Sequence, residues 1–360
     1  MMLYTVNRSL ERKAKLHQIL HHPYFGFFAL GFLLLFVQFL RITGVNIPIT
    51  VLRGLGLTMI YIIIALGFSI LLGYAGLASL GTAGFVGIGT YLIGYLTNAK
   101  GYSISMILVI GFLGAIAIGT IVGFISLRIE GLYLGIITLG LSEILNEVFK
   151  NATAITNGTN GLLMNRIVLF GQYYQFNSNT IFIAIVFILI LVMVLTLNIM
   201  KSPTGRAMLA MRNSESAAQA MGVSVLKYRL LAFIIATVYA FLGGILYMTY
   251  IGFSIPTTWN LAFSLFVLAA VIVGGSQSIA GVVLGTFMIF GLDLAVFQQI
   301  TFFQENPDIT FILNGVLIVV VVMFYPGGLA RLLTNLKFKI TNLVKKLMKK
   351  WKAYKYGEDD

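Results

Sequence analysis

Residues 52–72 read Leu-Arg-Gly-Leu-Gly-Leu-Thr-Met-Ile-Tyr-Ile-Ile-Ile-Ala-Leu-Gly-Phe-Ser-Ile-Leu-Leu, and Arg53 is the one charged side chain among them. A helix of about 20 such residues crosses the ~30 Å hydrocarbon core of a bilayer. The whole chain has the same character, since 59% of its 360 residues are apolar and 10% are charged. A soluble domain has roughly a quarter of its residues charged. We therefore predict a helical membrane protein.

Ten apolar runs of this kind follow one another along the chain. They cover approximately residues 24–41, 52–72, 79–97, 104–126, 131–149, 180–199, 229–251, 261–273, 279–298 and 309–326. The run at 79 is rich in glycine and the run at 261 is short, so one of them could be re-entrant or broken. The sequence thus predicts an all-α, polytopic membrane protein with about ten transmembrane helices.

The basic residues are clustered between these runs. The formal net charge is +13, which on a polar surface would indicate a nucleic-acid binder. Lys and Arg instead mark cytoplasmic segments, and ten spans with both ends inside place 19 of the 24 basic residues on the cytoplasmic face. The segment 150–179 is then the longest loop on the outer face. We expect a multi-pass protein of the cell membrane, with membrane lipid and no nucleic acid as a partner.

Three parts of the chain follow from this topology. Residues 1–23 form a cytoplasmic N-terminal segment, 24–327 a transmembrane domain that contains a polar segment at 201–228, and 328–360 a basic cytoplasmic tail. In the tail, Leu336, Ile340, Leu343, Leu347 and Trp351 recur at helical spacing with lysines on the other face. This pattern predicts an amphipathic helix that lies on anionic lipid.

The chain lacks the residues on which several classes of enzyme depend. The chain has no Cys, and its three His lie close together near the N-terminus, so we expect neither a metal site nor a thiol nucleophile. No GxxxxGK[ST] loop is present to cradle the phosphates of ATP, and no HExxH or GxSxG motif occurs. We predict that the chain is not an enzyme and holds no cofactor.

Charged residues at membrane depth are costly and often functional. Glu143, Asn146, Glu147 and Lys150 follow at i, i+3, i+4 and i+7, near the outer end of the fifth run. The stripe faces either a water-filled vestibule or a neighbouring helix, and the other interpretation is that Glu147 and Lys150 merely reach the interface. These two acids also suggest one candidate function, that of a secondary carrier that couples the movement of its solute to that of an ion through Glu143 and Glu147.

Glycine and hydroxyl side chains suggest a route for a solute. The glycines of the third run allow helices to pack closely, and the stretch from Tyr74 to Gly81 could also break the helix and expose backbone groups. Hydroxyl groups along such a route can bind a polar solute without trapping it as fixed charges would. We predict that Ser79, Thr82, Thr138 and Ser142 contact the solute, and that Glu143 lies in the outer vestibule.

The central polar segment contains a short helix with its own end signals. Ser214 is a suitable N-cap, Glu215 lies in the first turn where the helix dipole favours an acid, and Gly222 follows Met221 as a stop. A two-turn helix between two spans has no core of its own. We predict that it inserts into a groove of a partner protein.

Four segments resemble the permeases of branched-chain amino acid ABC importers, and the M-type subunit more than the H-type. They are Gly205 to Phe233 with its Glu-x-Ala-Ala-x-x-x-Gly core, Leu66 to Gly81, Gly131 to Gly161, and Val273 to Gly281. Two details differ from the family pattern, Thr82 in Gly81-Thr82-Ala83 and the run Gly274-Gly275-Ser276-Gln277-Ser278. Because relatives carry urea, amides, nucleosides or sugars, these differences leave the substrate open.

The resemblance implies a fold and an assembly. The fold is the ten-helix, cobalamin-type import fold with an inverted repeat, although the two halves show no convincing sequence similarity. The partners are a second permease subunit, two cytoplasmic ATPases that bind the ATP, and an extracytoplasmic binding protein. The residues implied to couple to an ATPase are Arg212, Glu215, Ala217, Ala218 and Gly222.

Overall fold

The computed structural model describes residues 24–46, 48–126, 132–164, 167–169, 172–174, 178–297, 300–305, 307–325, 327–332 and 334–335. The predicted N-terminal segment and nearly all of the amphipathic tail lie outside these residues. Within them the chain is almost entirely helical. The first half contains α2 (Phe25–Ile42), α3 (Ile49–Ser69) with the π-helical turn η1 (Ile70–Tyr74), α4 (Thr82–Lys100), α5 (Ile104–Ser126), α6 (Leu132–Asn151) and α7 (Thr153–Thr156).

The second half has the same character. It contains α8 (Ser178–Lys201), α9 (Pro203–Asn213), α10 (Glu215–Ala220), α11 (Val225–Ile251), α12 (Leu261–Gly274), α13 (Ile279–Thr286), η4 (Phe287–Gly291), α14 (Leu292–Ala295), α15 (Thr301–Glu305) and α16 (Pro307–Phe324). Two 3-10 turns lie in the connections, η2 (Gly158–Asn160) and η3 (Pro256–Thr258). A helix is therefore present in each of the ten predicted runs.

Six segments of the described chain are long and apolar enough to cross a membrane. They are Phe25–Ile42, Ile49–Tyr74, Ile104–Ile125, Asn179–Lys201, Val225–Ile251 and Pro256–Gly274, and Ile279–Ala295 is a shorter apolar helix. The protein is thus polytopic, as predicted. The number of ten complete crossings stays a prediction.

Two small antiparallel ladders qualify the all-α prediction. β1 (Leu162–Leu163) pairs with β4 (Phe253–Ser254), and β2 (Ile167–Leu169) pairs with β3 (Gln172–Tyr174). In the first ladder Leu162 lies opposite Ser254, in a connection far along the chain. Strands of two or three residues are too short to show a period of two in the sequence, so the apolar pattern could not reveal them.

The helix α11 lies at the centre of the bundle, where it packs against α3, α4 and α5. Glycines allow the closest approach: the backbone of α4 at Val86 leaves no room for a Cβ at Gly244, and the backbone at Phe241 leaves none at Gly89. The small residues predicted to permit tight packing therefore do so between α4 and α11.

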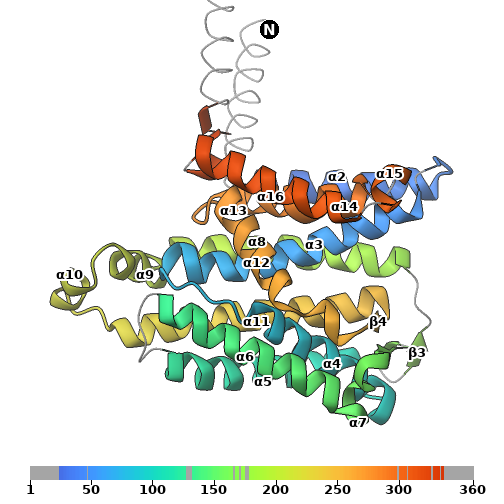
Figure 1. Ribbon diagram of the computed structural model, residues 1–360, viewed down its shortest axis with the longest axis horizontal. Helices are drawn as coiled ribbons and strands as arrows, with labels where there is room; N and C mark the ends of the chain where they lie inside the picture. The colour runs from blue at the N-terminus through green and yellow to red at the C-terminus, as the bar shows by residue number, and fades with distance from the viewer. Residues whose placement is uncertain are drawn as a thin grey trace, which may run out of the picture.

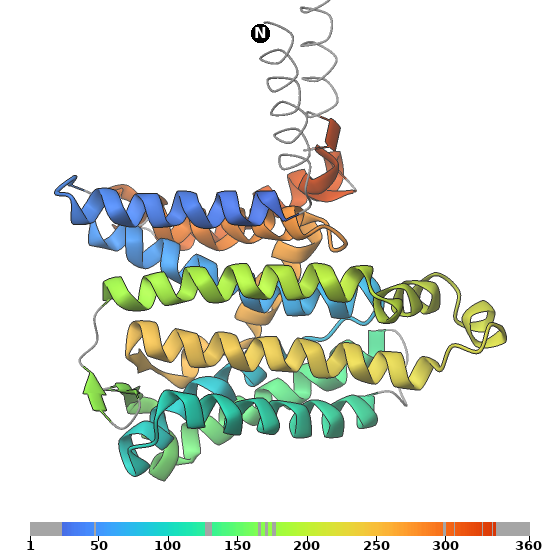
Figure 2. The same cartoon turned by 180° about the vertical axis from the view of Figure 1, so that it is seen from behind.

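The two ends of the bundle differ. The long helices run side by side, and α9 and α10 project beyond one end, while α7, β3 and β4 lie at the opposite end (Figures 1 and 2). Segments predicted to share the cytoplasmic face also meet in space, since Gly73 is hydrogen-bonded to both Arg212 and Gln277. These three segments therefore lie at one end of the bundle, and the side of the membrane that they face stays a prediction.

Candidate functional site

The chain leaves its helical path between α3 and α4. The last bonds of α3 widen, so that the N–H of Ala75 donates to the carbonyl of Ile70 at 3.2 Å and that of Leu77 to Leu71 at 3.0 Å. Gly76 then adopts a φ of 73°, which a glycine enters without steric cost. The next helix begins only at Thr82. The predicted break of the helix near 74–81 is therefore present, and it lies inside the bundle.

Hydroxyl groups of neighbouring helices cap the start of α4. The N–H of Leu80 donates to Oγ1 of Thr138 at 2.9 Å, the N–H of Ala83 to Oγ of Ser264 at 2.9 Å, and the N–H of Gly84 to Oγ of Ser142 at 3.2 Å. The first N–H groups of any helix lack partners within it, and the bilayer interior has no water to supply them. Ser264 and Ser142 thus bind two of the first N–H groups of α4, and Thr138 binds the N–H of Leu80 just before it, so that the helix can begin inside the bundle.

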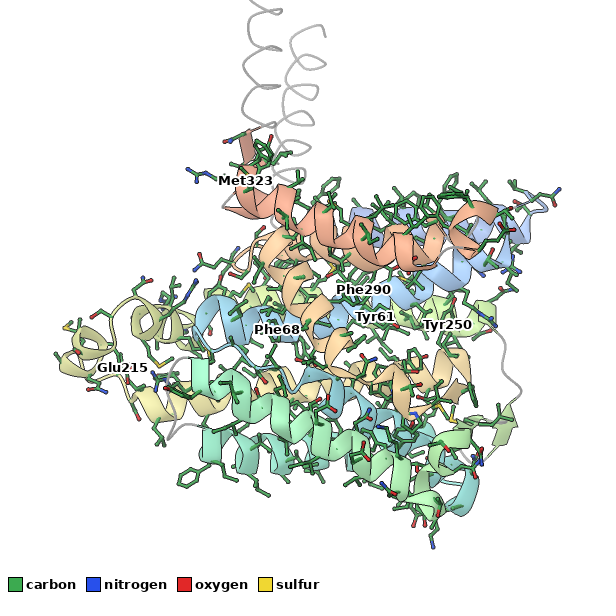
Figure 3. The ribbon with its side chains drawn as sticks, in the orientation of Figure 1. Tyr61, Phe68, Glu215, Tyr250, Phe290 and Met323 are labelled. Carbon is green, nitrogen blue, oxygen red and sulfur yellow. The ribbon has the colours of Figure 1, made fainter. Side chains whose placement is uncertain are left out.

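A narrow cavity adjoins the same break. It lies between α3, the start of α4 and α11, and its polar lining consists of the hydroxyls of Ser79, Thr82 and Thr237. The rest of the lining is apolar and includes Phe68, which lies within the bundle in Figure 3. The volume of about 10 Å³ is the room that one water molecule needs. An amino acid does not fit, so any passage here requires the helices to move apart.

The predicted pathway residues thus fall into two groups. Ser79 and Thr82 line the cavity. Thr138 and Ser142 do not line it and instead accept hydrogen bonds from backbone N–H groups, Thr138 from Leu80 in the broken segment and Ser142 from Gly84 in α4. Thr138 Oγ1 also donates to a carbonyl of its own helix, that of Leu134 at 2.9 Å or Gly135 at 3.0 Å. Contact of Thr138 and Ser142 with a solute remains a prediction, and capping is the role that their bonds give them.

The predicted stripe on α6 is divided between two faces. Glu143 and Glu147 are exposed, and Glu147 forms an ion pair of 2.7 Å with Lys150. Asn146 instead is buried and donates to the carbonyls of Pro256 at 2.8 Å and Trp259 at 3.0 Å. Adjacent residues on a helix differ by about 100°, and the edge of the bundle falls between Asn146 and Glu147.

Apart from Glu143 and Glu147, the exposed face of α6 is mostly apolar. Its large exposed apolar side chains are Tyr133, Ile136, Ile137, Ile144 and Val148. Glu143 lies eight residues before the end of α6 at Asn151, which is about 12 Å along the helix axis. An exposed carboxylate thus lies well inside the apolar length of the helix.

The polar segment between α8 and α11 contains the predicted short helix as α10 and, before it, the helix α9, which was not predicted from the sequence. Ser202 caps α9 by accepting the N–H of Gly205 at 3.2 Å, and Ser214 caps α10 by accepting the N–H of Ala217 at 3.4 Å. Gly222 ends the segment with a φ of 78°. Glu215 forms an ion pair of 2.5 Å with Arg229 at the start of α11, which fixes the short helix to the bundle. Figure 3 shows Glu215 at the projecting end.

The five residues predicted to face an ATPase point in different directions. Ala217 and Gly222 are exposed, and beside them Met221 is 85% exposed. Ala218 is buried against the chain itself, Glu215 holds Arg229, and Arg212 donates to the carbonyl of Gly73. The exposed residues of α10 are therefore Ser216, Ala217, Gln219 and Ala220, and Met221 follows directly after the helix.

The comparison with known families identifies the chain. Residues 50–322 match the family described as the permease component of branched-chain amino acid transport systems. The chain belongs to this family.

Relatives of this permease cover most of its length. It is 32% identical over 335 residues to the "High-affinity branched-chain amino acid transport system permease protein LivM" of Escherichia coli K12. The matched residues cover 86% of this chain and 77% of that relative. It is 25% identical over 315 residues to the "Probable branched-chain amino acid transport permease protein LivM" of Methanocaldococcus jannaschii, covering 75% of this chain and 90% of the relative. No solved structure matches the chain.

Sequence reasoning missed those residues of the permease whose partners lie far along the chain. Thr237 and Ser264 carry hydroxyls that look like any others inside apolar runs, and Gln277 was noted only as a departure from the family pattern. Ser264 bonds to Ala83 across 181 positions. No local pattern could have indicated that contact, whereas the glycine stretch before Thr82 did indicate the break that needs it.

Proposed function

We propose that this chain is the permease subunit of an ABC importer and carries branched-chain amino acids, or a related small polar solute, across the cell membrane. ATP hydrolysed by two cytoplasmic ATPase subunits drives the transport. The observation that carries this assignment is the capped helix α10, which projects from one end of the bundle (Figures 1 and 2). It exposes Ala217, and Met221 directly after the helix is exposed as well. A short exposed helix that is anchored to the bundle through Glu215 and Arg229 suits insertion into a groove of a partner.

The exposed and buried alanines of α10 provide the test. We expect Ala217→Glu to leave the permease folded but to reduce uptake of labelled leucine and co-purification of the ATPases at least about tenfold, the equivalent of about 1.4 kcal/mol. The matched control is Asn46→Glu, which places the same charge on an exposed residue of the connection between α2 and α3, away from both proposed partner surfaces. Ala218 is unsuitable because its side chain is buried in the chain's own packing. Normal uptake and ATPase binding by Ala217→Glu would contradict the proposal.

We assign the end with α9 and α10 to the cytoplasm and the loop 150–179 to the outer face. The low basic content of this loop and its position opposite α10 support the assignment, and it is the surface proposed to meet the binding protein. Since the chain has no Cys, single cysteines report their side directly. We expect Thr159→Cys to react with an impermeant maleimide in intact cells, and Gln219→Cys on α10 to react only after permeabilisation. The opposite pattern would reverse the topology.

The exposed face of α6 is proposed to meet the second permease subunit. A carboxylate such as Glu143 among apolar residues is costly in contact with lipid, and a water-containing path between two subunits avoids that cost. The starts of α4 and α12 support the proposed inverted repeat. Each start follows an interruption between two long helices, and the N–H of Ala83 in α4 donates to Oγ of Ser264 in α12. Two related halves of opposite orientation would bring these two starts together.

The side chains that line the cavity have the chemistry to bind an aliphatic amino acid once the helices have moved apart. Hydroxyls of Ser79, Thr82 and Thr237 can bind polar groups without a fixed charge, and the apolar remainder of the lining can face an aliphatic side chain. The relatives named above are branched-chain amino acid permeases. The comparisons give no support to the ion-coupled alternative, because the family is described as a component of a transport system. The family is also one of permeases and not of enzymes.

A further inference from the structure

One carbonyl oxygen joins three separate parts of the permease. The carbonyl of Gly73, at the end of η1, accepts a hydrogen bond from Nη1 of Arg212 and another, at 3.2 Å, from Nε2 of Gln277. Arg212 belongs to α9, next to the helix proposed to dock on an ATPase, and Gln277 belongs to the turn between α12 and α13. The last carbonyls of a helix lack partners within it, and a cation there is favoured by the helix dipole.

The side chain of Arg212 also packs against the broken segment itself. A Cβ at Gly76 would lie 3.0 Å from Cγ of Arg212, and Gly76 already has a left-handed φ of 73°. Gly73 in turn lies so close to Ser276 that its backbone leaves no room for a Cβ. A bulky residue at either glycine would therefore push the three parts of the chain apart.

The junction borders a large open cleft. The cleft has a volume of about 490 Å³, and its lining includes Leu72, Arg212, Gln277 and Gly327. It is much larger than the narrow cavity beside Ser79, which holds about 10 Å³. The turn η1 contributes a residue to each, Leu71 to the cavity and Leu72 to the cleft, and Gly73 follows these two residues directly.

We propose that Arg212 is a positioning residue that transmits movement of the ATPase-facing segment to the broken segment 75–81, through the Gly73 carbonyl and with Gln277 as its second anchor. This inference rests on the proposed function and changes one part of it, because Arg212 then acts toward the interior of the permease and not as an ATPase contact. The ion pair between Glu215 and Arg229 holds α10 on α11, and the bond from Arg212 to Gly73 holds α9 on α3. A displacement of α9 and α10 therefore pulls on the end of α3, from which residues 75–81 lead to Ser79 and Thr82.

The first test measures solute transported per ATP hydrolysed by the full complex in proteoliposomes. We expect Arg212→Leu to lower this ratio about fivefold or more, the lower range of a coupling between two sites, while the ATPases stay bound and hydrolyse ATP. Arg212→Lys should restore part of the ratio because a donor to Gly73 remains. The matched control is Arg206→Leu on the same helix, whose guanidinium donates to the local carbonyl of Lys201 at 2.8 Å and should leave the ratio unchanged.

Gln277→Leu provides a second, independent variant. It removes the other donor to Gly73 without altering the ATPase-facing segment, so it tests the junction even if Arg212→Leu fails to assemble. Because both donors act on one acceptor, the double variant should lower the ratio by less than the product of the two single effects. An unchanged ratio in Arg212→Leu and Gln277→Leu, or an equal loss in Arg206→Leu, would overturn the proposal.

The second test follows the broken segment directly. In the complex with a single cysteine at Ser79→Cys, we expect the rate of thiol modification to change between ADP and a non-hydrolysed ATP analogue, and this response to disappear when Arg212→Leu is added. Retention of the response in that variant, or its absence in an ATP-hydrolysing complex with native Arg212, would refute the inference. Transport that needs no ATP in the unaltered complex would instead refute the proposed function, so the two failures are distinguishable.

Discussion

Two helices of this permease begin under opposite conditions. The start of α10 is exposed to solvent and is capped by the hydroxyl of the adjoining Ser214. The start of α4 is buried, has no side-chain cap at Gly81, and depends on Thr138, Ser142 and Ser264 from two other helices. An N–H of α10 that loses its cap can turn to water, whereas the N–H of Ala83 lies in a buried bond and cannot. A hydroxyl cap therefore contributes little to the stability of the permease at α10, whereas the caps at the start of α4 are needed for that part of the chain to fold.

The largest effect is expected from the interior caps. Thr138→Val preserves the shape of the side chain but leaves the N–H of Leu80 without its partner, and Ser264→Ala does the same to Ala83. Thr138 and Ser264 are both fully buried, and an unsatisfied buried donor costs about 1–3 kcal/mol. We expect each variant to lower the thermal midpoint of the permease in detergent, as followed by fluorescence-detected size exclusion, and the pair to lower it further.

Thr58→Val is the matched control for the interior caps. Thr58 is buried in α3, and its hydroxyl donates to the carbonyl of Gly54 at 2.7 Å without accepting any N–H bond identified in the described residues. The substitution therefore removes a donor and leaves no backbone N–H unpaired. If Thr58→Val destabilised the permease as much as Thr138→Val, the capping explanation for the start of α4 would fail.

The exposed cap should have a smaller and more local effect. Ser214→Ala removes the acceptor of the N–H of Ala217, and loss of such a cap costs about 1 kcal/mol in a helix, whereas Ser214→Gly costs only a few tenths. We expect the thermal midpoint of the whole permease to stay the same in both variants. The affinity for the ATPases should fall about fivefold in Ser214→Ala, which corresponds to about 1 kcal/mol, and little in Ser214→Gly. Equal losses of affinity would show that the serine hydroxyl contacts the partner instead of capping α10.

The contrast also explains which features the sequence could reveal. The apolar runs located the long helices, and Ser214, Glu215 and Gly222 predicted α10 correctly because a local cap lies beside the helix that it serves. The glycines near 74–81 predicted the break before α4. The hydrogen bonds from Leu80 to Thr138 and from Gly84 to Ser142 are not visible in the sequence, because each joins residues that are 58 positions apart. The division of Asn146 from Glu147 depends on where the bundle ends, which periodicity on one helix does not determine.

The smallest effect is expected on the other face of α6. Glu143 is exposed and has no ion pair within the described residues, so Glu143→Gln, which keeps its volume and polarity, should leave the thermal midpoint unchanged. Glutamine still offers a polar group to the proposed water-containing path between the two permease subunits, so the change in free energy should stay within about 0.5 kcal/mol and uptake within about twofold of the unaltered complex. Because ATP supplies the energy, a protonophore should not alter ATP-driven uptake in either protein. Uptake that is lost in Glu143→Gln and also abolished by the protonophore in the presence of ATP would restore the ion-coupled alternative, because only a carrier that titrates this carboxylate during its cycle needs both.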